Sequence, residues 1–190
     1  MIWQLIARIV SRPAVATWLI NRAQRTPYSH IQSADGAQRY MGRWWLFNPY
    51  PHGSDGDGRP FPWLPSVRIH HICRADRDRH LHDHPWNART IVLRGWYNEE
   101  RPFDVANPLP SESTGAHVVQ GQLREYFCHH AGYTGRLLFG QYRRISAVSS
   151  GGVWTLFIVG RKRGTWGFEV NGHKVPWREY LGVDEEGGAA

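Results

Sequence analysis

The sequence predicts an all-β domain preceded by two short N-terminal α-helices. Ten Trp residues and an aromatic content of 13% favour strands, on which large rings pack well. From residue 39 onward, short apolar segments recur at intervals of roughly 8 to 12 residues, with turn-forming residues between them. Residues 2–25 instead repeat their apolar side chains with the period of a helix. The chain of 190 residues is long enough for one such domain with a sizeable core.

The helical part of the sequence divides near Pro13. Its first half places apolar side chains at i, i+3, i+4, i+7 and i+8, namely Ile2, Leu5, Ile6, Ile9 and Val10. Ser11 then precedes a proline suited to the first turn of a second helix, which runs to about Arg25. We expect residues 1–26 to pack on the main domain, over an open sheet edge. A membrane-surface or oligomer contact is the alternative, with four arginines on the polar side: Arg8, Arg12, Arg22 and Arg25.

Ten further segments are predicted strands. They are residues 39–47, 66–74, 88–94, 96–101, 121–130, 136–140, 143–148, 153–160, 165–170 and 173–177. Asn171-Gly172 between the last two is the signature of a tight hairpin turn. Many short strands with turns between them indicate a sandwich or small barrel over residues 39–182. Residues 183–190 are predicted to be a frayed end.

The charge pattern limits the partners. The formal net charge is +7, and only Lys162 and Lys174 among the 23 basic residues are lysines. Arginine matches carboxylate and phosphate geometry, so the bias suits an anionic partner, although a coding bias explains it equally. The arginines form no block, which makes a nucleic-acid partner unlikely. No apolar stretch approaches the roughly 18 to 20 residues of a membrane span, and no signal peptide is evident, so we expect a cytoplasmic protein without a membrane partner.

The run HLHDHPW at residues 80–86 carries the clearest chemical signal. On a strand, alternate side chains project from one face, so His80, His82 and His84 would point the same way. Two neighbouring imidazoles on that face lie close enough to share one metal ion, whereas the third lies about 13 Å along the strand from the first. A solvated polar strand is the alternative interpretation.

The surroundings of this run resemble the two signature motifs of the cupin superfamily. His82-x-His84 is followed at cupin spacing by position 88 and Gly95, and Gly132 is followed by Gly140 and position 143. The segments HDHPW, LRGWY and WTLFIVGRKRGTWGF are similar to those of small phage and bacterial cupins, some of them cysteine-dioxygenase-like. The resemblance implies a double-stranded β-helix, or jelly roll. It also implies a small-molecule enzyme of the metal-dependent oxygenase type, with a divalent metal, most typically Fe(II).

The departures from the cupin pattern fall on the metal ligands. Ala88 occupies the position of the acidic ligand and Arg143 that of the third histidine, so His82 and His84 alone remain from the usual set. A replacement ligand would have to come from another side chain, and the candidates are Glu99, His80, His129 and His130. A guanidinium at position 143 repels a divalent cation, but it can clamp a carboxylate or phosphate, or pair with Glu99 or Asp83.

Three functions remain open on this reasoning. The first is a metal-dependent enzyme in which Glu99 and Tyr97 are catalytic and Arg143 and Trp86 bind the substrate. The second is a non-catalytic cupin that binds an anionic small molecule, with Arg143, His84, Tyr97 and Trp side chains lining the pocket. This function requires no metal. The third is a phage structural or assembly protein that uses the jelly roll as a scaffold. A homodimer is compatible with each, since cupins commonly pair.

Overall fold

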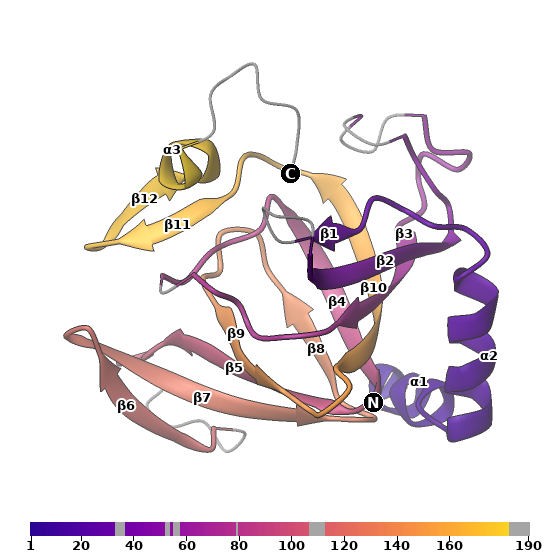
Figure 1. Cartoon of the computed structure of the whole chain (residues 1–190), viewed down its shortest axis with the longest axis horizontal. Coiled ribbons are helices and arrows are strands. Elements are labelled where there is room, and N and C mark those ends of the chain that lie inside the picture. Colours follow the sequence, from indigo (N-terminus) through magenta and orange to yellow (C-terminus); the bar gives the residue numbers. More distant parts are fainter. Residues whose placement is uncertain (33–36, 52–53, 55–57, 79, 107–112, 183–190) are drawn as a thin grey trace.

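The computed structural model describes the chain except residues 33–36, 52–53, 55–57, 79, 107–112 and 183–190, so the predicted frayed end lies outside the described residues. Two antiparallel sheets face each other (Figure 1). The larger sheet contains, in spatial order, β1 (Ile31–Gln32), β2 (Arg39–Phe47), β3 (Ser66–Ile72), β10 (Val153–Lys162), β4 (Trp86–Arg94) and β8 (Thr134–Leu137). The smaller sheet contains β6 (Gly115–Val119), β7 (Gln122–His130), β5 (Trp96–Pro102) and β9 (Arg144–Val148).

The strand order is that of a jelly roll. His82 forms isolated bridges to Arg143 and to Phe168, so the segment around it acts as a short strand beside β9. The core strands can be numbered along the chain, with β3 as strand 1, the His82 segment as strand 2 and β10 as strand 8. The order across the larger sheet is then 1-8-3-6, and the order across the smaller sheet is 2-7-4-5. This alternation between two sheets is the double-stranded β-helix. The predicted fold class is therefore confirmed.

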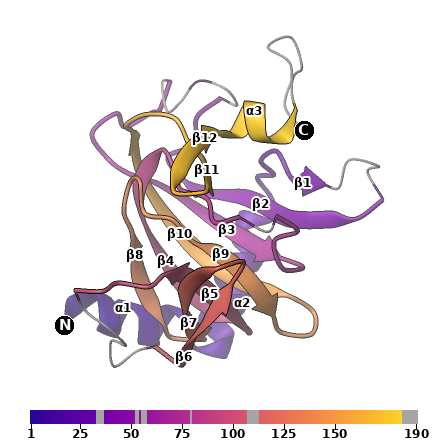
Figure 2. The same cartoon turned by 90° about the vertical axis from the view of Figure 1, so that its left-hand side faces the viewer.

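A hairpin and a short helix close one end of the barrel. The hairpin pairs β11 (Gly167–Val170) with β12 (His173–Pro176), and α3 (Trp177–Leu181) follows it directly. Asn171 and Gly172 have φ of 52° and 79°, as a two-residue turn of type I′ requires, so the predicted hairpin is correct. Both views place this unit at one end of the sheets (Figures 1 and 2).

The two N-terminal helices, α1 (Ile2–Val10) and α2 (Pro13–Ala23), cover the outer face of the larger sheet. Their small and apolar side chains share one buried cluster with alternate residues of the strands: Ala7, Ala16, Leu19, Ile20, Ala23, Trp44, Ile69, Ile91, Leu93 and Leu156. The helices thus pack on a sheet face and not on an edge, because these strands offer an apolar outer row. No helix in the described part of the chain is long and apolar enough to span a membrane.

Three local predictions were wrong or incomplete. The histidine run does not form a regular strand, since only His82 is bridged to its neighbours. The buried Asp83 instead accepts hydrogen bonds from the Gly167 backbone N–H (2.7 Å) and the Lys174 ammonium (2.5 Å), so bonds from residues far along the chain hold the segment in place. The sequence interpretation also missed β1, β6 and α3. Pro176 ends β12 and, as the N-cap, starts α3, where a strand was expected to continue to residue 177.

Candidate functional site

His82 and His84 face the space between the two sheets. In β3, β4 and β10, every second side chain packs against the N-terminal helices. The side chains between them, which include His70 and Phe157, point into the space between the sheets. The His82 and His84 rings lie 5.3 Å apart between centroids, at an interplanar angle of 89°. His84 also stacks on Trp86, at 5.9 Å and 22°. The two imidazoles therefore converge, and aromatic rings surround them.

The aromatic wall continues on the closing hairpin. The His82 ring contacts Trp166 at 6.2 Å and Phe168 at 5.9 Å between centroids. Phe168 in turn stacks on Tyr180 of α3 at 3.9 Å. His80, which the sequence placed on the same face as His82, instead hydrogen-bonds the Tyr180 hydroxyl group at 2.9 Å. It helps to dock α3 and does not join the other two imidazoles.

Arg143 lies opposite the two imidazoles. The backbones of His82 and Arg143 exchange two hydrogen bonds, each of 2.9 Å, and the Arg143 side chain is only 7% exposed. Burial lowers the pKa of His84 well below its usual value, and the positive charge of Arg143 acts in the same direction. Burial and Arg143 also lower the pKa of His82, against the opposing effect of the Asp76 carboxylate. Both rings are therefore neutral at pH 7.

A third inward histidine was missed by the sequence interpretation. His70 on β3 stacks on Phe157 at 4.8 Å, and its pKa is lowered well below the usual value by burial and by Arg68 and Arg43. His70 alternates along β3 with Ile69, which packs against the helices, so His70 points into the space between the sheets. The strand sequence SVRIHHI contains the signal, because alternation puts one of the two adjacent histidines inward.

Glu99 on β5 is the buried acid of the site, with 2% exposure. Its carboxylate accepts a hydrogen bond of 2.5 Å from Arg101 Nε and a longer one of 3.4 Å from Arg143, and it lies 4.0 Å from His129 Nε2. Burial alone would raise the pKa of Glu99, but Arg143 and Arg101 outweigh it, and the pKa is lowered. Glu99 is therefore ionised and engaged by two guanidinium groups.

Tyr97 lies next to this acid, on the same face of β5. It is buried, and its ring contacts that of His129 at 5.0 Å. Burial and the neighbouring Glu99 charge raise the pKa of Tyr97 well above its usual value. Tyr97 is thus a hydrogen-bond donor at pH 7, and proton loss from it is disfavoured.

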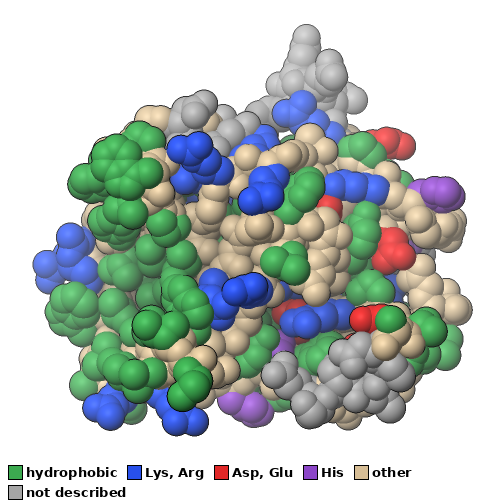
Figure 3. Space-filling model, turned by 180° about the vertical axis from the view of Figure 1, so that it is seen from behind, with side chains coloured by type: hydrophobic (Ala, Val, Ile, Leu, Met, Phe, Trp, Pro, Cys, Tyr) green, Lys and Arg blue, Asp and Glu red, His purple; other side chains and the backbone are tan. Residues whose placement is uncertain are grey.

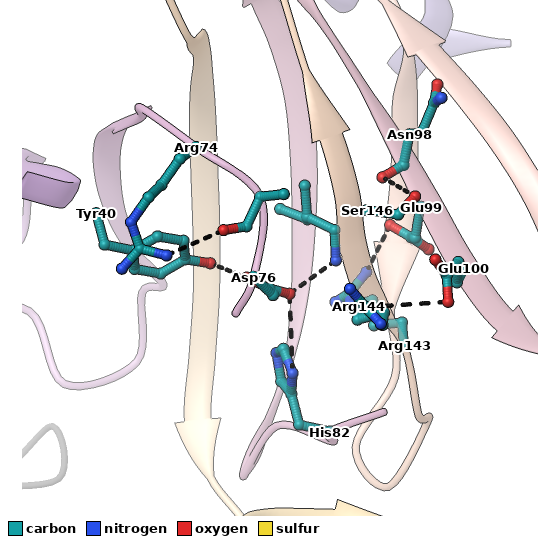
Figure 4. Close-up of polar contacts among 12 residues, drawn as sticks. Tyr40, Arg74, Asp76, His82, Asn98, Glu99, Glu100, Arg143, Arg144 and Ser146 are labelled. Atoms are coloured by element: carbon teal, nitrogen blue, oxygen red, sulfur yellow. Dashed lines mark hydrogen bonds and ion pairs between the residues drawn. The ribbon is translucent and has the colours of Figure 1, made fainter. Parts of the chain in front are cut away.

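Asp76 lies in the loop after β3 and contacts His82 (Figure 4). It accepts hydrogen bonds from the Tyr40 hydroxyl group and from the Ile145 backbone N–H (2.7 Å), and its other contact is His82 Nδ1 at 4.0 Å. The alternating charges of residues 74–79 gave no sign that one carboxylate points toward the histidines.

The residues at the pocket do not fit a cupin metal centre. His82 and His84 could share an ion, but no group of three or more His, Cys, Asp or Glu side chains within the described ranges is arranged to hold one. Glu99 is engaged by Arg101 and Arg143, and His130 lies next to Cys128, with 3.1 Å between Nε2 and Sγ. A guanidinium occupies the third-ligand position and opposes a divalent cation electrostatically.

Several polar atoms in the pocket have no hydrogen-bond partner among the described residues. They are Trp86 Nε1, His70 Nε2 and His129 Nε2, all buried. A buried donor or acceptor without a partner costs about 1–3 kcal/mol, so such atoms are usually satisfied by water or a ligand. Trp86, which the sequence assigned to substrate binding, thus offers a free indole N–H next to His84.

A cavity of about 400 Å³ lies away from the cluster of His82, His84 and Arg143. Leu81, Phe103, Leu123 and Glu169 are among its lining residues, whereas His82, His84 and Arg143 are not. Leu81 precedes His82 and projects from the opposite face of the segment. This cavity is therefore distinct from the site built around the imidazoles.

No family model and no curated protein matches the chain. Among solved structures, an oxalate decarboxylase–formate complex of Lactobacillus farciminis is 13% identical, with a TM-score of 0.47 over 87% of this chain and 36% of that chain. A mutant of the Bacillus subtilis oxalate decarboxylase is 12% identical, with a TM-score of 0.46 over 88% and 33%. An Fe(II)-HppE complex with an alternative substrate is 10% identical, with a TM-score of 0.42 over 70% and 55%.

The chain therefore spans about a third of the two decarboxylases and about half of Fe(II)-HppE. These distant likenesses carry no argument about activity. The strand order defines the chain as a jelly roll, and the residues around His82 and His84 depart from a three-histidine metal centre. The chemistry of the site is accordingly argued from the residues of this chain.

The buried His129 predicts a pH-dependent stability. Burial lowers its pKa from 6.5 to about 4, so the unfolded chain takes up this proton at a higher pH than the folded chain. The stabilisation is complete above pH 6.5 and is lost as the pH falls toward 4, by roughly 1.4 kcal/mol per pH unit. The free energy of unfolding can be measured with urea at several pH values between 6.5 and 4. In His129→Gln it should change less steeply with pH than in the wild type, by the equivalent of about one proton. An identical slope in both proteins would contradict the assignment.

Proposed function

We propose that this protein binds a small anionic molecule inside the barrel, with the Arg143 guanidinium as the anchor. One observation carries the proposal. Arg143 is almost fully buried and has five N–H donors, yet its side chain makes one hydrogen bond within the described residues, at 3.4 Å to Glu99. Glu99 has a shorter bond, of 2.5 Å, from Arg101. Most of the hydrogen-bonding capacity of Arg143 is therefore available to a ligand.

The charge balance of the pocket supports an anion. Arg101 and Arg143 share the single carboxylate of Glu99, and the lowered pKa values of the surrounding imidazoles leave them uncharged. The carboxylates of Asp76 and Asp83 lie on the side of His82, and Asp83 is paired with Lys174. Around Glu99 itself, two guanidinium groups face one carboxylate, so positive charge is in excess there. A buried charge that is only partly compensated is costly, so a bound anion stabilises this arrangement.

The pocket walls define the class of ligand. A guanidinium binds a carboxylate or a phosphate through two parallel hydrogen bonds. The Trp86 indole N–H and the neutral His84 ring lie next to each other and can hydrogen-bond further ligand oxygens. Trp166 and Phe168 provide an apolar surface beside His82 for a carbon skeleton. The ligand class is thus a small organic carboxylate or phosphate.

Removing the guanidinium should weaken anion binding strongly. Titration of the wild type with acetate and with inorganic phosphate, at constant ionic strength, should give saturable NMR shifts at the Trp86 indole N–H. Arg143→Leu should weaken binding at least about tenfold, since a charge-assisted hydrogen bond contributes about 1.5–3 kcal/mol.

Arg144→Leu is the matched control for this titration. It removes the same charge from the neighbouring residue, whose Nε lies 3.9 Å from Glu100 on the opposite face. Glu100 keeps its 3.0 Å bond from Arg124, so the control should fold and bind normally. Equal affinities in the wild type and Arg143→Leu would reject Arg143 as the anchor.

A metal-dependent oxygenase remains the second candidate, and the convergence of two imidazoles favours it. If Arg143 is what excludes a metal, Arg143→His should create the missing ligand. Fe(II) or Co(II) should then bind at least about tenfold more tightly than to the wild type, because three ligands hold such ions better than two.

Co(II) absorption bands and metal analysis after gel filtration measure the gain of the metal site. Adding His82→Ala to Arg143→His should abolish it. A wild type that retains one equivalent of Fe(II), with no gain in Arg143→His, would favour the oxygenase over the anion-binding function.

A further inference from the structure

Helix α1 is amphipathic, and its apolar face is wider than the part that the sheet covers. Ile6, Ala7 and Val10 pack against the larger sheet. Beside them on the helix, Ile2, Leu5 and Ile9 are exposed to between 44% and 68%. Trp18 of α2 is also 64% exposed. Large apolar side chains that lie exposed together normally mark a binding surface, so the uncovered part of this apolar face calls for a partner.

Unpaired arginines accompany this apolar surface. Arg8, Arg12, Arg22 and Arg25 are all exposed, and none forms an ion pair with another described residue. Residues 1–34 contain no Asp or Glu. Figure 3 shows hydrophobic side chains gathered on the half of this face that holds the helices, with Lys and Arg around them, whereas the visible acidic side chains lie on the other half.

The charges argue against a second copy of the chain as the partner. A two-fold dimer through this surface would be isologous, so the same patch would face itself. The arginines of one helix pair would then meet those of the other, with no carboxylate from residues 1–34 to compensate. Like charges placed together across an interface disfavour association. The partner must therefore be apolar and negatively charged.

We propose that α1 and α2 bind peripherally to an anionic lipid surface. We define the helical face as Met1, Ile2, Leu5, Ile9 and Trp18. In the proposed complex, these side chains enter the boundary between the lipid headgroups and the acyl chains. The four arginines contact the lipid phosphates, as in other interfacial amphipathic helices. Trp18 suits this depth because its ring is apolar and its N–H is polar. The inference is independent of the anion pocket, and it departs from the expectation that the protein has no membrane partner.

Vesicle co-sedimentation tests this surface directly. Wild-type protein should sediment with vesicles of 70% phosphatidylcholine and 30% phosphatidylserine, and at least tenfold less with phosphatidylcholine alone. High salt should release it, since the attraction to anionic lipid is screened. Leu5→Glu with Ile9→Glu should reduce binding at least tenfold. Replacing the four arginines by Gln should reduce binding to the anionic vesicles to the level of the neutral ones.

The matched control places two carboxylates on apolar side chains elsewhere. Val105→Glu with Val118→Glu changes residues that are at least as exposed but lie outside the helices. This variant should bind vesicles like the wild type, and circular dichroism melting should confirm that each variant is folded.

Two results would overturn the proposal. One is that wild-type protein does not sediment with anionic vesicles, or that Leu5→Glu with Ile9→Glu binds them equally well. The other is a dimer in analytical ultracentrifugation that this variant abolishes, without any vesicle binding, which would assign the helical face to a second copy of the chain.

Discussion

The backbone pairing of His82 with Arg143 is the constraint on which the site depends. Two hydrogen bonds of 2.9 Å fix the histidine segment beside the start of β9. This pairing completes the smaller sheet of the jelly roll and places a permanent positive charge opposite His82 and His84. Because the same contact builds the barrel and charges its interior, the fold and the electrostatics of the pocket cannot be separated.

The charge on Arg143 determines the state of its neighbours. It helps to keep His84 neutral and Glu99 ionised, and Glu99 in turn holds Arg101. Tyr97 stays protonated beside that carboxylate. A three-histidine metal centre would require a neutral, electron-donating side chain where this guanidinium stands. The residues around Glu99 therefore carry two guanidinium groups for one carboxylate, and it is on this imbalance that the proposed anion site rests.

Sequence periodicity and turn chemistry predicted most of the fold. Helical spacing identified α1 and α2, and Asn171-Gly172 identified the hairpin of β11 and β12, because these signals are local. His82 and Arg143 were identified from the resemblance to the two cupin motifs, and not from local periodicity. His70 and Asp76 were missed because they reach the pocket through strand pairing and a loop path that no local pattern encodes. The irregular histidine segment also depends on distant partners, the Gly167 N–H and Lys174.

The central claim is that Arg143 makes the barrel interior a site for anions. Diffraction near the selenium edge, from crystals soaked in selenate, tests it most directly. The account predicts an anomalous peak within hydrogen-bond distance of the Arg143 guanidinium and close to the Trp86 indole N–H. A barrel without such a peak, in which Arg143 binds Glu99 alone and a metal ion lies between His82 and His84, would contradict it.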